Sequence, residues 1–165
     1  MNLERFALPV KKLKGTDPVE TLDLSRNSLG VVSAVVIASL IGINGVLTSI
    51  DLRGNQLCGI WTDMWGSQQG TYTAEGIIAI ADALRVNGAL TVIDLLRNHL
   101  DEESAHMLAE VAKQKGISLC GIRRDQTTAC FMPPNRYQCL TPPEVILLAS
   151  DLSQAVVTGA LTNLK

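Results

Sequence analysis

The sequence is poor in aromatic and in charged residues. Aromatic side chains make up 4% of its 165 residues and charged ones 18%, whereas 47% of the residues are hydrophobic. A core built from this chain therefore consists mainly of Leu, Ile, Val and Ala, and the length suits one domain of ordinary size. The net charge of -2 gives no electrostatic reason to expect nucleic acid or an anionic membrane surface as a partner. The basic runs at 11–14 and 123–124 are short, and we interpret them as solvated surface.

The chain also lacks the motifs of common enzyme chemistry. It contains no Gly-rich phosphate loop, no G-x-S-x-G turn and no H-E-x-x-H helix. We interpret the two histidines, His99 and His106, as surface or boundary residues. We therefore predict no catalytic residues, no cofactor and no enzyme activity.

Cysteines are few and widely spaced. The four are Cys58, Cys120, Cys130 and Cys139, and no pair has C-x-x-C spacing. This spacing indicates neither a disulfide scaffold nor a zinc site. We predict reduced thiols that pack mostly in the core, in a cytoplasmic, reducing compartment, and no metal.

One long segment has no charge at all. The 22 residues from Leu29 to Ile50 are uncharged, which is long enough to span a bilayer. The alternative is a buried helix followed by a buried strand.

Three copies of one pattern favour a buried helix followed by a buried strand over a membrane span. VETLDLSRNSL (19–29), LTSIDLRGNQL (47–57) and LTVIDLLRNHL (90–100) align on their apolar positions and on one asparagine. Asn27 and Asn55 are 28 residues apart, whereas Asn55 and Asn98 are 43 apart, so the second interval holds 15 additional residues. VVIASLIGINGVLTSIDL (35–52) aligns with IAIADALRVNGALTVIDL (78–95), which places the additional residues between Leu57 and Thr73. In this frame the uncharged segment holds a turn, a helix at about 33–43 and a strand.

The pattern L-x-x-L-x-L-x-x-N-x-L resembles that of leucine-rich-repeat proteins of the long-repeat, ribonuclease-inhibitor-like class. The resemblance implies an α/β solenoid in the shape of a horseshoe arc, with short parallel strands on the concave face and helices on the convex face. It also implies a role in protein binding. The whole chain, 1–165, then forms a single array. Residues 1–18 are a degenerate N-terminal segment that contains Leu3, Phe6 and Leu13, with Pro9 limiting any helix. Clear repeats cover 19–46, 47–89 and 90–116, and degenerate repeats cover 117–165.

Helix boundaries can be predicted from end signals. Asp101 begins one helix, and Lys113 and Lys115 precede Gly116 at its end. Thr141, Pro142 and Glu144 have the spacing of a capping box around another helix start. Short strands are expected at 117–122 and 127–131. The final ALTNLK matches the start of a repeat strand, with Leu161 at a leucine position. This predicts an open C-terminal end that supports self-association or docking in a larger array.

Polar residues recur at fixed positions of the repeat. Because side chains alternate along a strand, Asp23, Asp51 and Asp94 are expected to point outward onto the concave face, roughly 5 Å apart. A catalytic group, a cation site and an ordinary structural column all fit this pattern. The structural interpretation is favoured because arginines recur two or three residues later: Arg26, Arg53 and Arg97. Asn27, Asn55 and Asn98 are predicted to bond unpaired backbone groups of the turns.

The additional residues hold both tryptophans and one of the two tyrosines. Trp61, Met64, Trp65 and Tyr72 all lie between Cys58 and Thr73, and such residues are typical of interface anchors. Two arrangements fit: the tryptophans pack within the chain, or one anchors the insertion while the other is presented. We predict a non-enzymatic module that binds a protein or peptide through Trp61, Met64, Trp65, Tyr72, Asp23, Asp51, Asp94 and Arg53. The alternative is a structural subunit docked through its C-terminal end. No nucleic-acid or membrane partner is expected.

Overall fold

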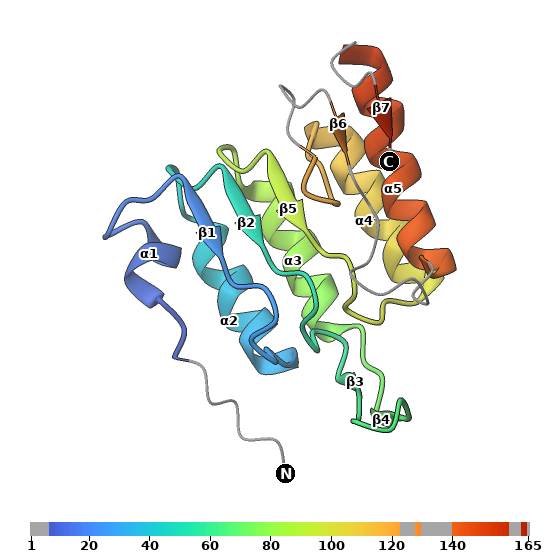
Figure 1. The fold of residues 1–165 in the computed structure, drawn as a ribbon. Coiled ribbons are helices and arrows are strands. Elements are labelled where there is room, and N and C mark those ends of the chain that lie inside the picture. Colours follow the sequence, from blue (N-terminus) through green and yellow to red (C-terminus); the bar gives the residue numbers. More distant parts are fainter. Residues whose placement is uncertain (1–6, 123–127, 130–139, 159–162, 165) are drawn as a thin grey trace.

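A computed structural model describes residues 7–122, 128–129, 140–158 and 163–164. It shows an α/β protein with a small parallel sheet of three strands in the order β1–β2–β5 (Figure 1). The strands are β1 (Thr21–Asp23), β2 (Ser49–Asp51) and β5 (Val92–Asp94). The described part of the chain has five helices: α1 (Val10–Lys14), α2 (Val31–Ile41), α3 (Glu75–Val86), α4 (Glu102–Lys115) and α5 (Pro142–Thr158).

The helices form a layer behind the sheet. Each helix packs against the next one in the sequence, from α1 to α5 (Figure 1). Strand pairing keeps the spacing of the repeat, because Leu22 pairs with Ile50 and Ile50 with Ile93. The predicted equivalence of the three segments is therefore confirmed.

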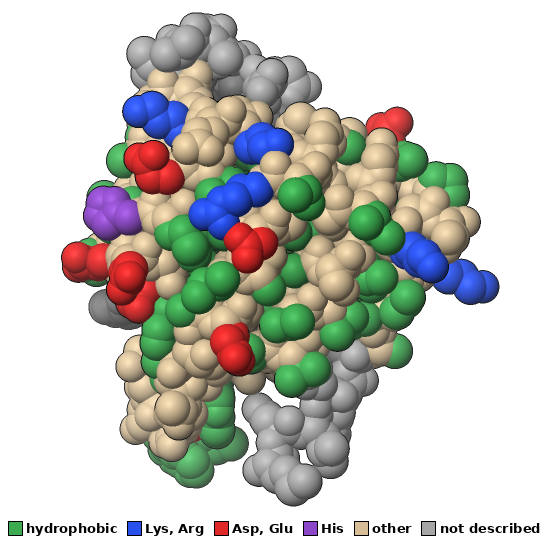
Figure 2. Space-filling model, turned by 180° about the vertical axis from the view of Figure 1, so that it is seen from behind, with side chains coloured by type: hydrophobic (Ala, Val, Ile, Leu, Met, Phe, Trp, Pro, Cys, Tyr) green, Lys and Arg blue, Asp and Glu red, His purple; other side chains and the backbone are tan. Residues whose placement is uncertain are grey.

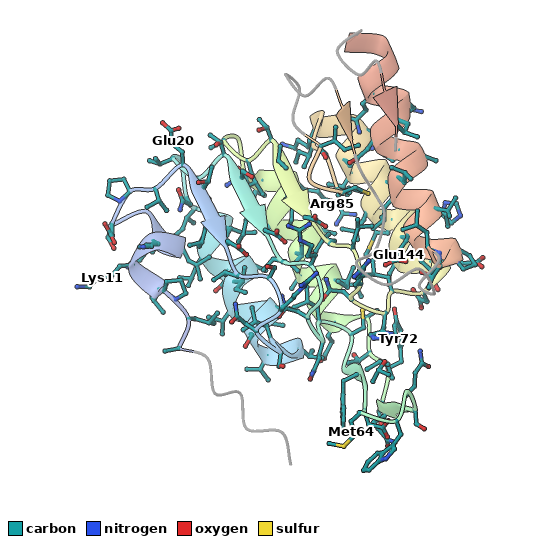
Figure 3. The ribbon with its side chains drawn as sticks, in the orientation of Figure 1. Lys11, Glu20, Met64, Tyr72, Arg85 and Glu144 are labelled. Carbon is teal, nitrogen blue, oxygen red and sulfur yellow. The ribbon has the colours of Figure 1, made fainter. Side chains whose placement is uncertain are left out.

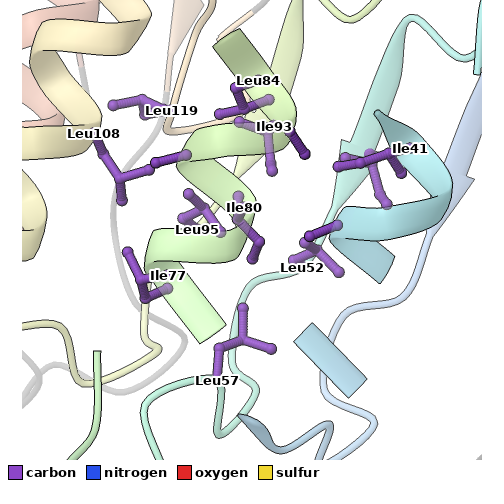
Figure 4. Close-up of a cluster of buried hydrophobic side chains, with 14 of the residues drawn as sticks. Ile41, Leu52, Leu57, Ile77, Ile80, Leu84, Ile93, Leu95, Leu108 and Leu119 are labelled. Atoms are coloured by element: carbon purple, nitrogen blue, oxygen red, sulfur yellow. The ribbon is translucent and has the colours of Figure 1, made fainter. Parts of the chain in front are cut away.

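A core of aliphatic side chains fills the space between strands and helices (Figure 4). On α3, Ile77, Ile80 and Leu84 are fully buried, and their spacing places them on one face of the helix. They lie among Leu52 and Leu95, which follow β2 and β5 (Figure 4). The scarcity of aromatics thus leads to a core of interlocking Leu and Ile side chains.

The uncharged segment 29–50 divides as the repeat predicts. It contains α2, which begins and ends two residues before the expected helix at 33–43, and the first residues of β2. None of the helices in the described ranges combines the length and apolar character that a transmembrane span requires.

The predicted helix ends are confirmed. The Asp101 side chain accepts a hydrogen bond from the Ser104 amide at 2.8 Å, and Gly116 ends α4 with a φ of 67°. At the start of α5, Glu144 Oε2 accepts from the Thr141 amide at 2.8 Å. Glu144 also reaches across to the turn after β5, where its Oε1 accepts from the Arg97 amide at 2.8 Å.

The segments at the two ends extend this layout. At the N-terminal end, α1 begins directly after Pro9 and buries Leu13. Residues 117–122 lie beside β5, where Ser118 and Cys120 form isolated bridges with Val92 and Asp94. The prediction of a strand at 117–122 was therefore wrong, because the pairing consists of single bridges. The two further strands predicted from the sequence are confirmed as β6 (Thr128–Ala129) and β7 (Asn163–Leu164), which pair in parallel. The predictions for Leu3, Phe6, Arg123, Arg124, Cys130, Cys139 and Leu161 lie outside the described residues.

Buried asparagines bond the turns that follow the strands. The Asn55 amide group donates to the carbonyls of Leu24 and Leu52 at 2.9 and 2.8 Å. Its Oδ1 accepts from the amides of Asn27 and Leu29. Asn98 repeats the donor half of this pattern, with bonds to the carbonyls of Leu52 and Leu95. The predicted structural role is confirmed for Asn55 and Asn98.

A second pair of asparagines bonds the turns that precede the strands. The Asn44 side chain donates to the carbonyls of Lys12 and Leu13 and accepts from the amides of Val46 and Leu47. One repeat later, the Asn87 side chain likewise donates to two carbonyls of the preceding repeat and accepts from two amides of its own turn. Asn44 and Asn87 were not singled out from the sequence, although N-G-x-L is repeated in INGVL and VNGAL.

Replacing Asn87 with Ala tests this second ladder. Asn87 is buried, donates to the carbonyls of Ile41 and Asn44, and accepts from the amides of Ala89 and Leu90. The substitution leaves these backbone groups without partners, so we expect the free energy of unfolding to fall by about 2–4 kcal/mol. Urea denaturation followed by circular dichroism measures it. Gln114→Ala, on the exposed side of α4, is the control and should change the free energy by less than about 0.5 kcal/mol; an equal loss in both variants would contradict the prediction.

Candidate functional site

The insertion between Leu57 and Thr73 forms a regular β-hairpin. Strand β3 (Ile60–Thr62) pairs antiparallel with β4 (Gln68–Gly70), with Trp61 opposite Gln69. The hairpin projects from the body of the protein, beyond the start of α3 (Figure 1). The additional residues are therefore an ordered hairpin, which lies within the limits predicted from the sequence.

Two glycines close the base of the hairpin. A Cβ on Gly59 would stand 2.5 Å from the Thr71 carbonyl oxygen, and one on Gly70 would collide with the Gly59 carbonyl. Both residues also have positive φ, 76° and 95°, which glycine adopts without steric cost. Just outside them, the Thr73 amide donates to the Cys58 carbonyl at 3.0 Å. The two chain segments can approach this closely only because both positions are glycine.

The tip of the hairpin is organised by Asp63. Its Oδ1 accepts from the amides of Trp65 and Ser67 at 3.0 and 2.8 Å, and its Oδ2 accepts from the Gln69 side chain at 3.1 Å. The backbone amide of Ser67 and these further donors favour the charged carboxylate and hold the pKa of Asp63 below its usual range. The backbone of the tip is therefore an ordered turn, which fixes the directions of the Cα–Cβ bonds on it.

Met64 and Trp65 occupy this tip and extend into solvent. Met64 is 87% exposed and Trp65 81% exposed, and Met64 lies at the end of the hairpin farthest from the sheet (Figure 3). Trp61 is half-buried, with its Cδ1 3.4 Å from the position of a Cβ on Gly70. The structure thus corresponds to the arrangement in which one tryptophan packs on the hairpin and the other is presented.

Tyr72 attaches the end of the hairpin to the helix layer. It is half-buried against the core, and its hydroxyl shares a hydrogen bond of 2.9 Å with the hydroxyl of Ser104 on α4. Burial raises the pKa of Tyr72 to about 12, so the phenol is neutral at physiological pH. Of the four large side chains predicted for partner binding, the structure places Met64 and Trp65 outward, Trp61 on the hairpin and Tyr72 against the body.

The three aspartates form a column in register, as predicted. Asp23 pairs with Asp51, and Asp51 with Asp94. Each carboxylate accepts a hydrogen bond from the amide two residues later, at 2.9, 3.0 and 3.1 Å. These short-range bonds shape the turn after each strand, which supports the structural interpretation of the column.

The column does not lie on one open face. Asp23 is exposed and Asp51 half-buried, but Asp94 is only 5% exposed. A Cβ on Gly121 would stand 2.9 Å from Asp94 Oδ2, so the 117–122 segment covers this carboxyl. The expectation that Asp94 points outward to a partner was therefore wrong, and the reason is a segment from the next part of the chain.

Arg53 is the cation of this column. Its guanidinium lies 2.7 Å from Asp51 Oδ2 and 3.7 Å from Asp94 Oδ2. Burial nevertheless raises the pKa of Asp94 to about 7, and the nearby charges of Asp51 and Asp151 act in the same direction. Desolvation outweighs the attraction of Arg53, because the guanidinium is about half exposed and is closer to Asp51.

A second buried carboxylate, on α5, was not singled out from the sequence. Asp151 is 3% exposed and accepts three hydrogen bonds, from the Ser118 hydroxyl and the amides of Leu119 and Cys120, at 2.6–2.8 Å. Burial raises its pKa. The signal was a lone acidic residue within the otherwise uncharged VILLASDL. Asp151 fixes the 117–120 segment to α5 and so completes the cover over Asp94.

The chemistry of the described residues is limited. Cys58 and Cys120 are free and buried, and burial raises the pKa of the Cys58 thiol to about 12. Within the ranges that the structure covers, no three His, Cys, Asp or Glu side chains gather as ligands for a metal ion. The described residues offer an exposed aromatic and thioether tip on the hairpin and, on the strand face, alternating charges. Both features are suited to binding.

No protein-family model and no curated protein sequence matches the chain.

Gly70→Ala tests the closed base of the hairpin. The new Cβ would collide with the Gly59 carbonyl, so β3 and β4 should separate. Because the collision adds to a left-handed strain that Gly66→Ala shares, we expect the amides in β3 and β4 to be at least about tenfold less protected from hydrogen exchange in Gly70→Ala than in Gly66→Ala, a factor that corresponds to 1.4 kcal/mol. Gly66→Ala is the matched control, since Gly66 also has a positive φ of 83° but no neighbour within 4 Å; it should cost only the left-handed strain of about 1–2 kcal/mol. Equal protection in Gly70→Ala and wild type would contradict the prediction.

Asp94→Asn tests the buried carboxyl through its pH dependence. The folded-state pKa of about 7 lies above the unfolded value of about 3.9, so the folded protein binds the extra proton between these values. Stability therefore falls as pH rises through this window, by up to about 4 kcal/mol. The advantage of the Asn variant over wild type in free energy of unfolding should therefore grow from pH 5 to pH 8, by about 2–3 kcal/mol, as measured by urea denaturation.

Asp23→Asn is the control for this titration. The pKa of Asp23 is lowered by a hydrogen bond from the Ser25 amide, so neutralising it should give no gain at pH 8. A difference between Asp94→Asn and wild type that stays constant from pH 5 to 8 would show that Asp94 keeps one charge state throughout.

Proposed function

We propose that this chain binds a protein or peptide partner, without catalysis, through the tip of its β-hairpin and the adjoining strand face. The observation that carries the proposal is the exposure of Met64 and Trp65, at 87% and 81%, on a tip fixed by hydrogen bonds. Exposed large apolar side chains on an ordered element lose little conformational freedom on binding, and Trp is enriched among the residues that dominate interface energies.

The strand face supplies the polar part of the proposed site. Asp23 and Arg53 are exposed and Asp51 is half-buried, so opposite charges alternate on the strand face. Such a pattern suits a polar partner and contributes to selectivity more than to affinity. Asp94 is excluded from the contact residues, because it is covered by the 117–122 segment.

The architecture we propose is a leucine-rich-repeat array of the long-repeat class, curved as a solenoid with its strands on the concave face. The in-register parallel strands, the 28- and 43-residue spacings and the asparagine turns support it. The hairpin is then a lateral addition to the second repeat. Buried free thiols at Cys58 and Cys120 support a reducing, cytoplasmic setting.

A pull-down with paired variants tests the binding proposal. The bait is the full chain, and the prey is an extract of the cells from which the sequence comes. The double variant Met64→Ala/Trp65→Ala should reduce recovery of partners by at least about tenfold, which corresponds to 1.4 kcal/mol or one hot-spot side chain. Val145→Ala, a 51% exposed valine on α5, is the matched control and should recover the same partners as wild type. The same partners at equal yield from the double variant would exclude the hairpin tip as the site.

A further inference from the structure

The two asparagines of the second ladder are each followed directly by glycine. Asn44–Gly45 and Asn87–Gly88 occupy equivalent positions, in the turns that precede β2 and β5. Asparagine before glycine is especially prone to deamidation, because glycine has no side chain to hinder attack by its backbone nitrogen on the asparagine side chain. The two pairs therefore share one chemical weakness, and the surroundings of each asparagine determine how well it is protected.

The reaction needs water and no enzyme. The backbone nitrogen of the glycine gives up its proton and attacks the asparagine Cγ, so that a C–N bond forms; the bond from Cγ to Nδ2 breaks, and the side-chain nitrogen leaves as ammonia. Water then opens the resulting succinimide ring at either of its carbonyls and gives aspartate or isoaspartate. An amide is thus replaced by a carboxylate, and in isoaspartate the main chain runs through the side-chain carbons.

The attacking nitrogens are accessible at both positions, whereas the side chains they attack are held in place. Gly45 and Gly88 are exposed, and a Cβ on either would have no neighbour within 4 Å. The Oδ1 of each asparagine accepts from two amides of its turn, at 2.6–2.9 Å. Cγ can approach the next nitrogen only when the side chain leaves these bonds and the two that Nδ2 donates. Protection against deamidation therefore depends on how firmly the partners of Nδ2 are held.

The partners of Asn87 Nδ2 belong to the interior of the helix layer. Asn87 donates to the carbonyls of Ile41 and Asn44, at 2.6 and 2.9 Å. Ile41 is fully buried and ends α2, an eleven-residue helix that packs against α1 on one side and α3 on the other. Release of the Asn87 side chain therefore requires that the end of α2 separate from the core.

The partners of Asn44 Nδ2 belong to α1 instead. Asn44 donates to the carbonyls of Lys12 and Leu13, at 3.0 Å each. Helix α1 has five residues, of which Leu13 is the buried one, and helices this short are not stable by themselves. It lies at one edge of the helix layer (Figure 1), where exposed lysines extend into solvent (Figure 2). Local opening at such an edge costs less than opening of the core, so the Asn44 side chain is released more often than that of Asn87.

We propose that Asn44 is a site of spontaneous deamidation in the folded protein, and that detachment of α1 controls its rate. Asn87 is the protected counterpart, with the same glycine after it and the same bonds to its Oδ1. The modification site lies at the turn before β2 and is separate from the hairpin tip.

The product cannot restore the contact with α1. A carboxylate has no hydrogen to donate to the carbonyls of Lys12 and Leu13, which are then left without this partner. Isoaspartate also adds a carbon to the main chain of the turn, which displaces the amides of Val46 and Leu47 from their acceptor. Deamidation thus turns a reversible detachment of α1 into a lasting one, and the Leu13 side chain, 0% exposed in the intact protein, comes into contact with water.

Incubation of the full wild-type chain near neutral pH, followed by tryptic digestion and mass spectrometry, tests the proposal. Asn44 lies in peptide 27–53 and Asn87 in peptide 86–97, and fragment ions distinguish Asn44 from Asn27. Asn44 should deamidate at least about tenfold faster than Asn87, since this factor needs a difference of only 1.4 kcal/mol in the cost of opening. In concentrated urea the two should react at nearly the same rate, because both follow a β-branched residue and precede glycine. Equal rates in the folded chain, or no conversion of Asn44 in the time that both need in urea, would overturn the proposal.

Two variants separate the chemistry from its control by α1. Gly45→Ala should abolish conversion of Asn44 over the same period, because the added methyl group hinders the attacking nitrogen, and the position has room for it and no positive φ. Leu13→Ala removes the buried anchor of α1 and should raise the rate at Asn44 at least about fivefold, with that at Asn87 unchanged. Lys11→Ala, an exposed change on the same helix, is the matched control and should leave both rates as in wild type. An equal increase at both asparagines in Leu13→Ala would overturn the role of α1, and undiminished conversion in Gly45→Ala would overturn the succinimide route.

Discussion

A turn between a strand and a helix leaves backbone amides and carbonyls without partners, and in this chain buried asparagine side chains bond them. Asn55 and Asn98 act where the chain leaves a strand, whereas Asn44 and Asn87 act where it enters one. Strands β1, β2 and β5 are only three residues long, so their own ladders contribute few hydrogen bonds. The positions of β2 and β5 therefore depend on the asparagines at their two ends. The aspartate column and the base of the hairpin depend on these strands in turn.

The parts of the fold that repeat could be predicted from the sequence, because each is set by residues a few positions apart. The helix at 31–41, the caps at Asp101 and Thr141 and the pairing of β1, β2 and β5 follow from apolar spacing and end signals. The hairpin could not be predicted in this way. It depends on the close approach of Gly59 and Gly70, and the insertion occurs in one repeat, so no second copy reveals its pattern. The burial of Asp94 could not either, because a segment more than twenty residues later covers it and Asp151, on α5, holds that segment in place.

Two regions of this small protein keep large apolar side chains in contact with water, and their physical designs differ. The hairpin tip is narrow and carries two side chains held by the hydrogen bonds of Asp63. The outer side of α2 and α3, with the exposed Val32, Val35, Val36, Ile78 and Val86, is broad and lacks aromatic side chains. A narrow aromatic tip suits insertion into a pocket of a partner, whereas a broad aliphatic face suits contact with an equally broad surface. Since the two regions lie on different elements, occupation of one leaves the other accessible.

The hydrogen bond between Cys58 and Thr73 affects how the sequence of the hairpin can change in evolution. The hairpin enters and leaves the body through one point, where the chain segments are already hydrogen-bonded. The hydrogen bond at the base offsets the entropic cost of closing the loop. Lengthening the hairpin beyond the base adds little to that cost. We expect that residues 60–69 can be exchanged for another hairpin, with Gly59 and Gly70 kept, without disturbing the asparagine turns before them or α3 after them. A new recognition specificity would require changes in this one short segment, while the scaffold stays constant.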